Sequence, residues 1–467
     1  MIVVTETTAE IGVTQTLAAF AADGPAAGVD HRDAVARALV DTVGVSLGAA
    51  GTPGERILAD WARAESSAGT ATVWTTGEKA SPSVAALVNG TAAHVLDFDD
   101  YSPSMPLHPS AVILPALVAV AESGDVTPTR FVEAYDVGAA AFRALADVLP
   151  QHVHYARGWH STSTIGRLAA VAALVRLVGL DRESARHALG IVSSLAAGSR
   201  PNFGSMTKPF HAGSAARDAV MAVELAGAGF TGNPDELEAP GGFLERYGDP
   251  DAAPVGSLAE TLDERLEYWQ DAWPRDWGLK RYPSCYGTHR GIDAMLQLRS
   301  EGIAGIPTRI RATLHPRGTR PLRTAPPTDP TQAKFSLEYC LASAFLRGGV
   351  GLDDFTLGAF SDPEVRSLMG AVSVAESAVP PTGDPVFQTG YTVVELEFED
   401  GSVRSARVEV TRGQAGDPLS DAELRAKFVD CCSAGGIGVA GAERIFASIQ
   451  SAPGAGFTSL IPRRTTA

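Results

Sequence analysis

The first half of the chain carries a pattern of apolar positions that is typical of helices. Between about residues 13 and 228, apolar side chains recur at spacings of three and four, and turns rich in Gly, Pro, Asp and Ser separate these stretches. The pattern predicts helices over Asp33–Leu47, Ser83–Leu96, Ala111–Ala121, Thr129–Leu149, Gly166–Val178, Ser184–Ala197 and Ser214–Ala228. We therefore expect a large all-helical domain.

The pattern changes character after Trp277. Apolar residues alternate with polar ones over Arg309–Leu314, over Val394–Phe398 and again over Val403–Val410. The last two stretches flank an Asp-Gly turn, which predicts a β-hairpin. Phe335–Leu346 shows helical spacing between these strands. A mixture of short strands and helices is therefore expected here.

The end of the chain returns to helical spacing. Ser420–Ile449 has a helical pattern that glycines interrupt near its middle. We expect this segment, residues 413–450, to pack back onto the helical domain of residues 13–277, leaving residues 278–412 as a smaller α+β lid domain. The predicted fold class is mainly α.

Composition and charge narrow the functional classes. The chain has 467 residues, of which 45% are hydrophobic and 20% charged, as in ordinary globular proteins. Its net charge of −16 argues against nucleic acids and anionic membranes as partners. The N-terminus lacks the pattern of a secretion signal, and no long uncharged apolar stretch predicts a membrane span.

The cysteines indicate a reducing compartment. The chain has four cysteines, without Cys-x-x-Cys spacing, and two of them are adjacent in sequence. These features predict free thiols instead of a disulfide framework or a zinc ribbon. We therefore expect a cytoplasmic protein. The cysteines are Cys285, Cys340, Cys431 and Cys432.

The densest ionisable chemistry lies at the end of one predicted helix. Residues 92–100 contain His94, Asp97, Asp99 and Asp100, and His108 follows closely. On a continued helix, residues 94, 97 and 100 would share one face because they are three apart. Such a cluster could bind a metal, relay protons or cap the helix, and the cluster alone does not decide between these roles.

Four further segments concentrate polar chemistry. Two of them, His154–Ser163 and Ser205–Gly213, are interpreted as polar loops that lead into helices. Such helix N-termini favour carboxylates because their free N–H groups and dipole attract anions. The other two segments are Lys280–Arg290 and the weaker Lys334–Ser336. Together these segments predict a pocket that binds a di- or tricarboxylate and transfers its protons through histidine.

Competing interpretations have less support. Taken singly, His94 could be a packed core histidine, Asp97 a helix cap and Lys208 a surface lysine. No His-x-x-x-His or Asp-x-Asp-x-Asp-Gly run is present, so no metal is predicted. Residues 436–441 match Gly-x-Gly-x-x-Gly, but no βαβ pattern surrounds them, so no nucleotide is predicted. We expect no cofactor.

Several motifs, in order along the chain, resemble those of the MmgE/PrpD family. They are Leu-Asp-Phe-Asp-Asp at 96–100 with His-Pro-Ser at 108–110, Gly-Trp-His-x-Thr-Ser at 158–163, Thr-Lys-Pro-Phe-His-Ala-Gly at 207–213, Gly-Phe-Thr-Gly at 229–232 and Lys-Arg-Tyr-Pro at 280–283. Ala-Lys-Phe-Ser at 333–336 resembles the family's lid-helix motif. The resemblance extends over about residues 13–450.

The resemblance implies a fold and a chemistry. The family includes 2-methylcitrate dehydratases, cis-aconitate decarboxylases and iminodisuccinate epimerases. It implies a helical domain, an α+β lid, a homodimer, and reactions of small polycarboxylates without a metal or an organic cofactor. Matched motif by motif, the family's pocket implies roles for Asp97, His108, His160, Lys208 and Lys280.

Signals for the subfamily conflict. The decarboxylases have a histidine just after the Lys-Arg-aromatic-Pro run, where this chain has Cys285, with His289 four residues later. In contrast, the Thr-Lys-Pro around Lys208 is more similar to the decarboxylases than to the methylcitrate dehydratases. Tyr155, five residues before His160, resembles a tyrosine that pairs with a lysine in epimerase-like members.

We therefore expect a cofactor-independent lyase, a dehydratase or decarboxylase of a small di- or tricarboxylate such as 2-methylcitrate or cis-aconitate. A dicarboxylate epimerase similar to the iminodisuccinate enzymes is the alternative, and an inactive binding protein is a third. Lys208, Lys280 and Arg281 would bind carboxylates, and His108 and His160 would transfer protons, with Asp97 orienting or charging one imidazole. The expected catalytic residues are Asp97, His108, Tyr155, His160, Lys208, Lys280 and His289, and the expected substrate contacts are Thr162, Ser163, Arg281 and Cys285.

Overall fold

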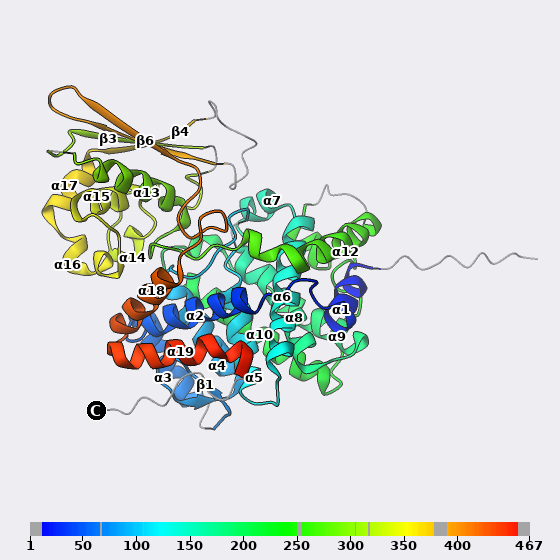
Figure 1. Ribbon diagram of the computed structural model, residues 1–467. Helices are drawn as coiled ribbons and strands as arrows, with labels where there is room; N and C mark the ends of the chain where they lie inside the picture. The colour runs from blue at the N-terminus through cyan, green and yellow to red at the C-terminus, as the bar shows by residue number, and fades with distance from the viewer. Residues whose placement is uncertain are drawn as a thin grey trace, which may run out of the picture.

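A computed structural model describes residues 12–65, 68–105, 107–249, 255–303, 305–315, 318–377 and 390–455. Helices form a large domain, and a smaller lid of helices and one sheet lies beside it (Figure 1). The two parts have separate hydrophobic cores. The fold class predicted from the sequence, a large helical domain with a smaller α+β domain, is confirmed.

The helical domain is built around four central helices. Helix α4 packs against α10, and α6 packs against α8. A Cβ at Gly90 of α4 would lie 2.9 Å from the Cα of Gly213 in α10, so only glycine permits this close approach. The elements are α1 (Val13–Asp23), α2 (Arg32–Gly48), α3 (Pro53–Glu65), β1 (Ala71–Thr72), β2 (Lys79–Ala80), α4 (Pro82–Val95), α5 (Ser110–Ala121), α6 (Pro128–Val148), α7 (Gln151–Ala156), α8 (Ser161–Val178), α9 (Arg182–Ser194), η1 (Arg200–Asn202), α10 (Thr207–Gly227), α11 (Phe243–Tyr247), α12 (Val255–Ala272) and η2 (Trp273–Asp276).

Helix α8 lies at the centre of this domain. It is long and apolar enough to cross a membrane by length and composition, yet 94% of it is buried inside the fold. A helix that is apolar all round is expected either in a large core or in a membrane. Burial among α5, α6, α9 and α10 gives α8 the environment of a core helix.

The lid combines one sheet with helices. Its strand order is β4-β3-β5-β6, with β3 parallel to β4 and antiparallel to β5. Strand β5 pairs with β6 in the predicted hairpin, and both β5 and β6 contact α13. The elements are α13 (Tyr286–Ser300), β3 (Arg309–Leu314), α14 (Pro330–Ala333), α15 (Leu337–Arg347), η3 (Leu352–Phe355), α16 (Leu357–Phe360), α17 (Pro363–Gly370), β4 (Val372–Glu376), β5 (Thr392–Glu397) and β6 (Val403–Val408).

The last two helices leave the lid and return to the helical domain. Helices α18 (Asp421–Ala434) and α19 (Val439–Ala455) pack against α2, as Figure 1 shows in orange and red. Phe428 and Phe446 belong to the helical core. Where the chain enters and leaves the lid, the two connections touch, because Leu279 N donates to Gly413 O at 2.8 Å.

The predicted starts of two helices were wrong by five residues or more. Helix α8 begins at Ser161 instead of Gly166, and α10 begins at Thr207 instead of Ser214. Polar residues fill the first turn of α8, and Thr207 and Lys208 begin α10, so apolar periodicity did not reveal these two starts. Helix α4 ends at Val95, which means that Asp97 and Asp100 lie beyond it and do not share a helical face with His94.

Candidate active site

A cavity of about 460 Å³ lies between the helical domain and the lid. The helical domain contributes the loop after α4, the end of α7, the start of α8 and the first turn of α10. The lid contributes the segment before α13 and the residues around Pro321 and Phe335. The cavity is lined by Asp97, His108, Tyr155, His160, Lys208, Lys280 and Cys285, which are all among the residues predicted from the sequence.

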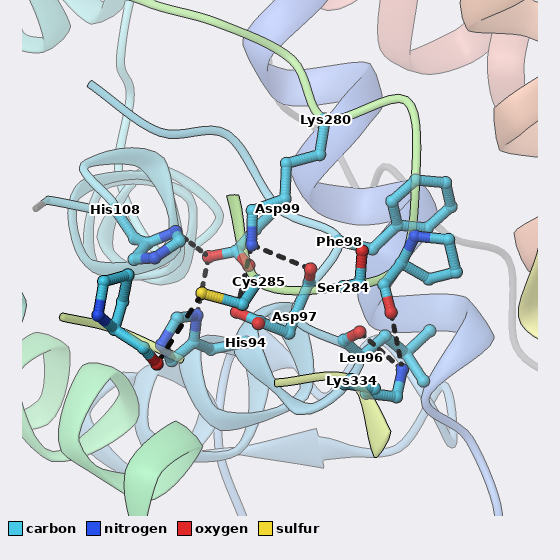
Figure 2. Close-up of polar contacts among 12 residues, drawn as sticks. His94, Leu96, Asp97, Phe98, Asp99, His108, Lys280, Ser284, Cys285 and Lys334 are labelled. Carbon is cyan, nitrogen blue, oxygen red and sulfur yellow. Dashed lines mark hydrogen bonds and ion pairs between the residues drawn. The ribbon is translucent and has the colours of Figure 1, made fainter. Parts of the chain in front are cut away.

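Asp97 is the centre of the charged cluster. It is the only non-glycine residue with a positive φ, 52°, within the described ranges, and this turn directs its side chain back toward the cavity. Its Oδ1 lies 2.9 Å from Lys208 Nζ and 3.0 Å from Lys280 Nζ. Figure 2 shows the Lys280 ammonium above this carboxylate. One carboxylate therefore holds one lysine from each domain.

Burial makes this ion cluster strong. Burial alone would raise the pKa of Asp97, but Lys208 and Lys280 outweigh it and hold that pKa well below its usual range. Likewise, burial would lower the pKa of Lys280, and the carboxylates of Asp97 and Asp99 raise it instead. Both groups are therefore charged at neutral pH. The Lys208 ammonium also lies 5.5 Å from the ring centroids of Phe203 and Phe335.

Asp99, and not Asp97, contacts the imidazoles. Asp99 Oδ2 lies 2.7 Å from His94 Nδ1 and 3.3 Å from His108 Nδ1, as Figure 2 shows. His108 Nδ1 also lies 2.8 Å from the carbonyl oxygen of Asp100. A neutral His108 with these two oxygens at Nδ1 carries its proton there, which leaves Nε2 as the proton acceptor. The prediction that Asp97 orients an imidazole was wrong, because the lysines occupy its carboxylate.

The imidazole of His94 lies behind the site. Burial lowers its pKa to about 3, so the ring is neutral. Burial also opposes the ionisation of Asp99, but His94 and His108 hold the pKa of that carboxyl well below its usual range. The His94 ring lies 4.6 Å from the His108 ring and 6.0 Å from the His160 ring, centroid to centroid. His94 thus packs against both cavity histidines and supports them.

His160 is the second imidazole in the cavity. It is the residue before α8 and is 1% exposed, and its Nδ1 lies 3.1 Å from His211 Nδ1. Burial and the nearby Lys208 ammonium hold the pKa of His160 well below its usual value, so its ring is neutral. His160 lies immediately before a helix, as predicted, whereas the prediction that Lys208 lies in a loop was wrong. Both are buried, and Lys208 lies in the first turn of α10.

Tyr155 and Cys285 are the other two predicted residues with ionisable side chains that line the cavity. The guanidinium of Arg200 lies 3.8 Å from the centroid of the Tyr155 ring. Burial raises the pKa of Tyr155, so its phenol is protonated. Burial also raises the pKa of the Cys285 thiol to about 11, which makes it a neutral group at physiological pH. Cys285 is therefore not an acid–base group at neutral pH.

The structure places four predicted residues away from the cavity lining. Thr162 supports the site indirectly, because its Oγ1 accepts a hydrogen bond of 3.2 Å from His108 N. Ser163 Oγ accepts from Arg167 Nη1 at 2.7 Å inside the helical core. His289 is fully buried behind Tyr286, with ring centroids 5.6 Å apart. Arg281 is exposed, so its predicted contact with substrate has no support here.

Sequence reasoning missed several residues of the cavity wall. Tyr101 joins the two domains, because its backbone pairs with Gly278 and its ring stacks on Tyr286 at 4.1 Å. Arg320 is an exposed lid residue that lines the cavity. Neither residue belongs to a motif with recognisable chemistry, and each reaches the cavity only through the packing of the lid.

Within the ranges that the structure describes, one group of side chains has the spacing of a metal site. The ligand atoms of His94, Asp99 and His108 lie within 4.8 Å of one another. However, Asp99 Oδ2 and the Nδ1 atoms of both histidines already contact one another. This arrangement suits hydrogen bonding that fixes the imidazoles, and a metal would have to break it.

A second cavity, of about 930 Å³, lies on the other side of the Asp97–Lys208 ion pair. Both of these residues and Phe335 line both cavities. Its walls also include His94 and Lys334, together with residues of α3. The ion pair is therefore part of the partition between two hollow regions.

Comparison with known proteins identifies the family. The MmgE/PrpD N-terminal domain matches residues 15–254, and the MmgE/PrpD C-terminal domain matches residues 282–450. The chain belongs to the MmgE/PrpD family. The family's C-terminal domain thus covers the lid together with α18 and α19, although these helices pack on the helical domain.

Among its relatives in this family are cis-aconitate decarboxylases. The human enzyme is 29% identical over 406 residues, which cover 84% of this chain and 81% of the human protein. The mouse enzyme is 28% identical over 409 residues, covering 84% of this chain and 80% of the mouse protein. A cis-aconitate decarboxylase-like protein of Aspergillus oryzae is 27% identical, covering 74% of this chain and 75% of that protein.

Proposed function

We propose that this MmgE/PrpD protein is a lyase that acts on a small di- or tricarboxylate without a metal or an organic cofactor. The observation that carries the proposal is the pairing of Lys208 and Lys280 at Asp97, beside His108 and His160 in one cavity. The arrangement offers fixed positive charge and two proton-transfer groups in a buried space. Its relatives named cis-aconitate decarboxylases support a lyase.

The lysines are suited to bind carboxylates. Lys208 belongs to the helical domain and Lys280 to the lid side, so a substrate between them would bridge the two. Because Asp97 already neutralises part of this charge, the cluster is stable by itself, and an anionic substrate competes for the same ammonium groups. Closure around the substrate would exclude water and strengthen each of these contacts.

The imidazoles are suited to move a proton next to a carboxylate. In a dehydration, a base removes the proton beside the carboxylate while the hydroxyl leaves with a proton as water. In a decarboxylation, the C–C bond to one carboxylate breaks, CO₂ leaves, and the carbanion takes up a proton. Both reactions develop negative charge that Lys208 and Lys280 would stabilise. A positioned acid or base such as His108 or His160 typically contributes about 10²–10⁴-fold.

Cis-aconitate is the first substrate to test. The relatives are named for that reaction, and they align over most of their length. Against this, the motif resemblance implies a histidine in the decarboxylases where this chain has Cys285, and the raised pKa of about 11 prevents this thiol from acting as a base. A methylcitrate-like hydroxyacid is therefore the second substrate.

Tyr155 favours one further reaction. Its protonated phenol lines the same cavity as Lys280 and could return a proton to the opposite face of a carbanion. Removal and return of the proton on different faces would make the enzyme an epimerase of a dicarboxylate. This second candidate shares the carbanion step with the lyase and differs only in the fate of the carbanion.

Proton NMR in D₂O distinguishes these reactions in one experiment. The protein is incubated separately with cis-aconitate, 2-methylcitrate and chiral dicarboxylates, including aspartate-derived imines. Loss of CO₂ or of water would identify the lyase, whereas deuterium incorporation with racemisation would identify the epimerase. A Lys208→Met variant serves as the inactive control. The lyase proposal is wrong if wild-type protein changes none of these acids, and tight binding without turnover would then indicate a binding protein.

A further inference from the structure

Three buried lysines hold three successive backbone carbonyls around Asp97. Lys334 Nζ donates to Leu96 O at 2.7 Å, and Lys280 Nζ donates to Asp97 O at 2.8 Å. Lys427 Nζ donates to Phe98 O at 2.7 Å. Figure 2 shows the contacts of Lys334 and Lys280 from opposite sides of the turn. We call Leu96, Asp97 and Phe98 the Asp97 turn.

Two of these lysines also hold the segment that carries Lys280. Lys334 Nζ donates to Pro283 O at 3.2 Å, and Lys427 Nζ donates to Lys280 O at 2.8 Å. Each therefore links the Asp97 turn to residues 280–283, one on each side of Asp97. Lys334 comes from the end of α14 in the lid, and Lys427 comes from α18. Neither lysine lines the 460 Å³ cavity.

The Asp97 turn needs such support. A non-glycine residue at φ 52° is uncommon and is less favourable than ordinary backbone. The turn follows the C-terminus of α4, where free carbonyls and the helix dipole attract positive charge. Lys334, which is 8% exposed, has no ion-pair partner among the described residues, so these carbonyls are its principal ligands. A buried ammonium without a carboxylate partner is costly unless such acceptors are fixed.

We propose that Lys334 and Lys427 are positioning residues, which hold the Asp97 turn and the Lys280 segment in register so that Asp97, Lys208 and Lys280 meet in the cavity. Neither residue touches the reacting atoms. This inference rests on the proposed lyase function only for its kinetic part. Its structural part concerns the turn itself and can be tested without substrate.

Lys334→Met is the principal variant. Methionine keeps the apolar stem and removes the donor, and no carboxylate is left unpaired. Lys427 also pairs with buried Asp41, at 2.5 Å, so Lys427→Met alone would leave a buried acid without its partner. The double variant Lys427→Met/Asp41→Asn removes both charges together. Lys79→Met/Glu122→Gln is the control, because Lys79 donates to Thr70 O at 2.9 Å and pairs with the buried side chain of Glu122 at 3.3 Å outside this site, and the second change leaves no carboxylate unpaired.

Hydrogen exchange is the first measurement, on the full-length protein without ligand. In Lys334→Met and in Lys427→Met/Asp41→Asn, amides of residues 96–102 should exchange at least about 10-fold faster, while those of α6 and α8 should keep their wild-type rates. Lys79→Met/Glu122→Gln should leave the exchange rates of residues 96–102 unchanged. Wild-type exchange of this segment in Lys334→Met, or faster exchange throughout the protein, would overturn the proposal.

Kinetics on the substrate found by NMR is the second measurement. Lys334→Met should lower kcat by about 10-fold or more with a smaller change in KM, since a displaced group of about 1 Å can cost 10²-fold. Adding Lys334→Met to Asp97→Asn should cost little more than Asp97→Asn alone, because both act on one turn. Fully additive losses would overturn the positioning role. If wild-type protein turns over no carboxylate, the lyase proposal fails, and the hydrogen-exchange result alone then decides whether Lys334 and Lys427 are positioning residues.

Discussion

Replacing Asp97 by asparagine should destabilise the protein markedly when no ligand is bound. Asp97 is 4% exposed, and its carboxylate lies 2.9 Å from Lys208 Nζ and 3.0 Å from Lys280 Nζ. Asparagine is nearly the same size as aspartate, so no cavity forms. The change leaves two buried ammonium groups without their shared counter-ion, and removal of one partner from a buried pair costs about 3–5 kcal/mol.

This free energy corresponds to a measurable shift in thermal stability. For domains of more than about 150 residues, 1 kcal/mol changes the Tm by roughly 2–4 °C. We take the lower figure because the helical domain is large, and expect Asp97→Asn to unfold about 6–10 °C below wild type. Differential scanning calorimetry at pH 7 measures the shift. The control is Asp60→Asn, which breaks an exposed pair with Arg63 and should shift the Tm by less than about 2 °C.

An inert tricarboxylate such as tricarballylate adds a second arm to this experiment. Because its carboxylates can replace the missing counter-ion, it should raise the Tm of Asp97→Asn by more than it raises that of wild type. If Asp97→Asn melts within about 2 °C of wild type in buffer, the ion cluster does not stabilise the fold by the amount expected for a buried pair. If the tricarboxylate stabilises wild type more, the lysines are not its binding groups.

Four other predictions concern the site and its surroundings. His108→Ala and His160→Ala should each lower kcat/KM by about 10²-fold or more in the assay found by NMR, and wild-type kinetics in either would remove that imidazole from the mechanism. Activity should survive dialysis against EDTA, and recovery only upon added Zn²⁺ would instead favour a metal at His94, Asp99 and His108. We expect a homodimer whose subunits contact each other through their helical domains, so light scattering should give twice the chain mass of 48.5 kDa. A monomer at micromolar concentration would contradict this prediction. Burial lowers the pKa of His154 from 6.5 to about 4, so the unfolded chain binds more protons than the folded chain below pH 6.5, and the folded state becomes less stable as the pH decreases. His154→Gln should remove about 2 kcal/mol of the stability that is lost between pH 7 and pH 5. A pH dependence in urea titrations that is the same in wild type and variant would refute this prediction.

The sequence allowed the helical scaffold to be predicted because burial imposes periodicity on apolar positions. Helix α6 and the β5–β6 hairpin follow that rule. The first turns of α8 and α10 did not, because serine and threonine fill the first of them and Thr207 and Lys208 begin the second, and all of these residues except Thr207 are nevertheless buried. Apolar spacing cannot reveal a buried polar turn, and these are the turns that carry catalytic candidates.

Candidate side chains could be named, but their directions could not. Lys280 and Arg281 are adjacent cations, yet one is fully buried against Asp97 and the other is exposed. Likewise, Asp97 and Asp99 are only two residues apart, but the positive φ at Asp97 turns their side chains in different directions. Asp97 contacts Lys280, whereas Asp99 contacts His94. Lys427 and Phe98 are 329 positions apart in the sequence, so no local sequence pattern predicts their contact.

The contact between Leu279 and Gly413 has a topological consequence. Because these residues are joined by a hydrogen bond of 2.8 Å, the lid is an inserted domain whose two tethers cross into it at one place. Because both covalent connections lie at one place, opening of the lid would be a rotation about that place, which moves the far edge at the β-hairpin most and Lys280 least and breaks the hydrogen bond from Lys334 to Leu96 O. The same geometry means that a short linker between residues 279 and 413 could close the helical domain without the lid.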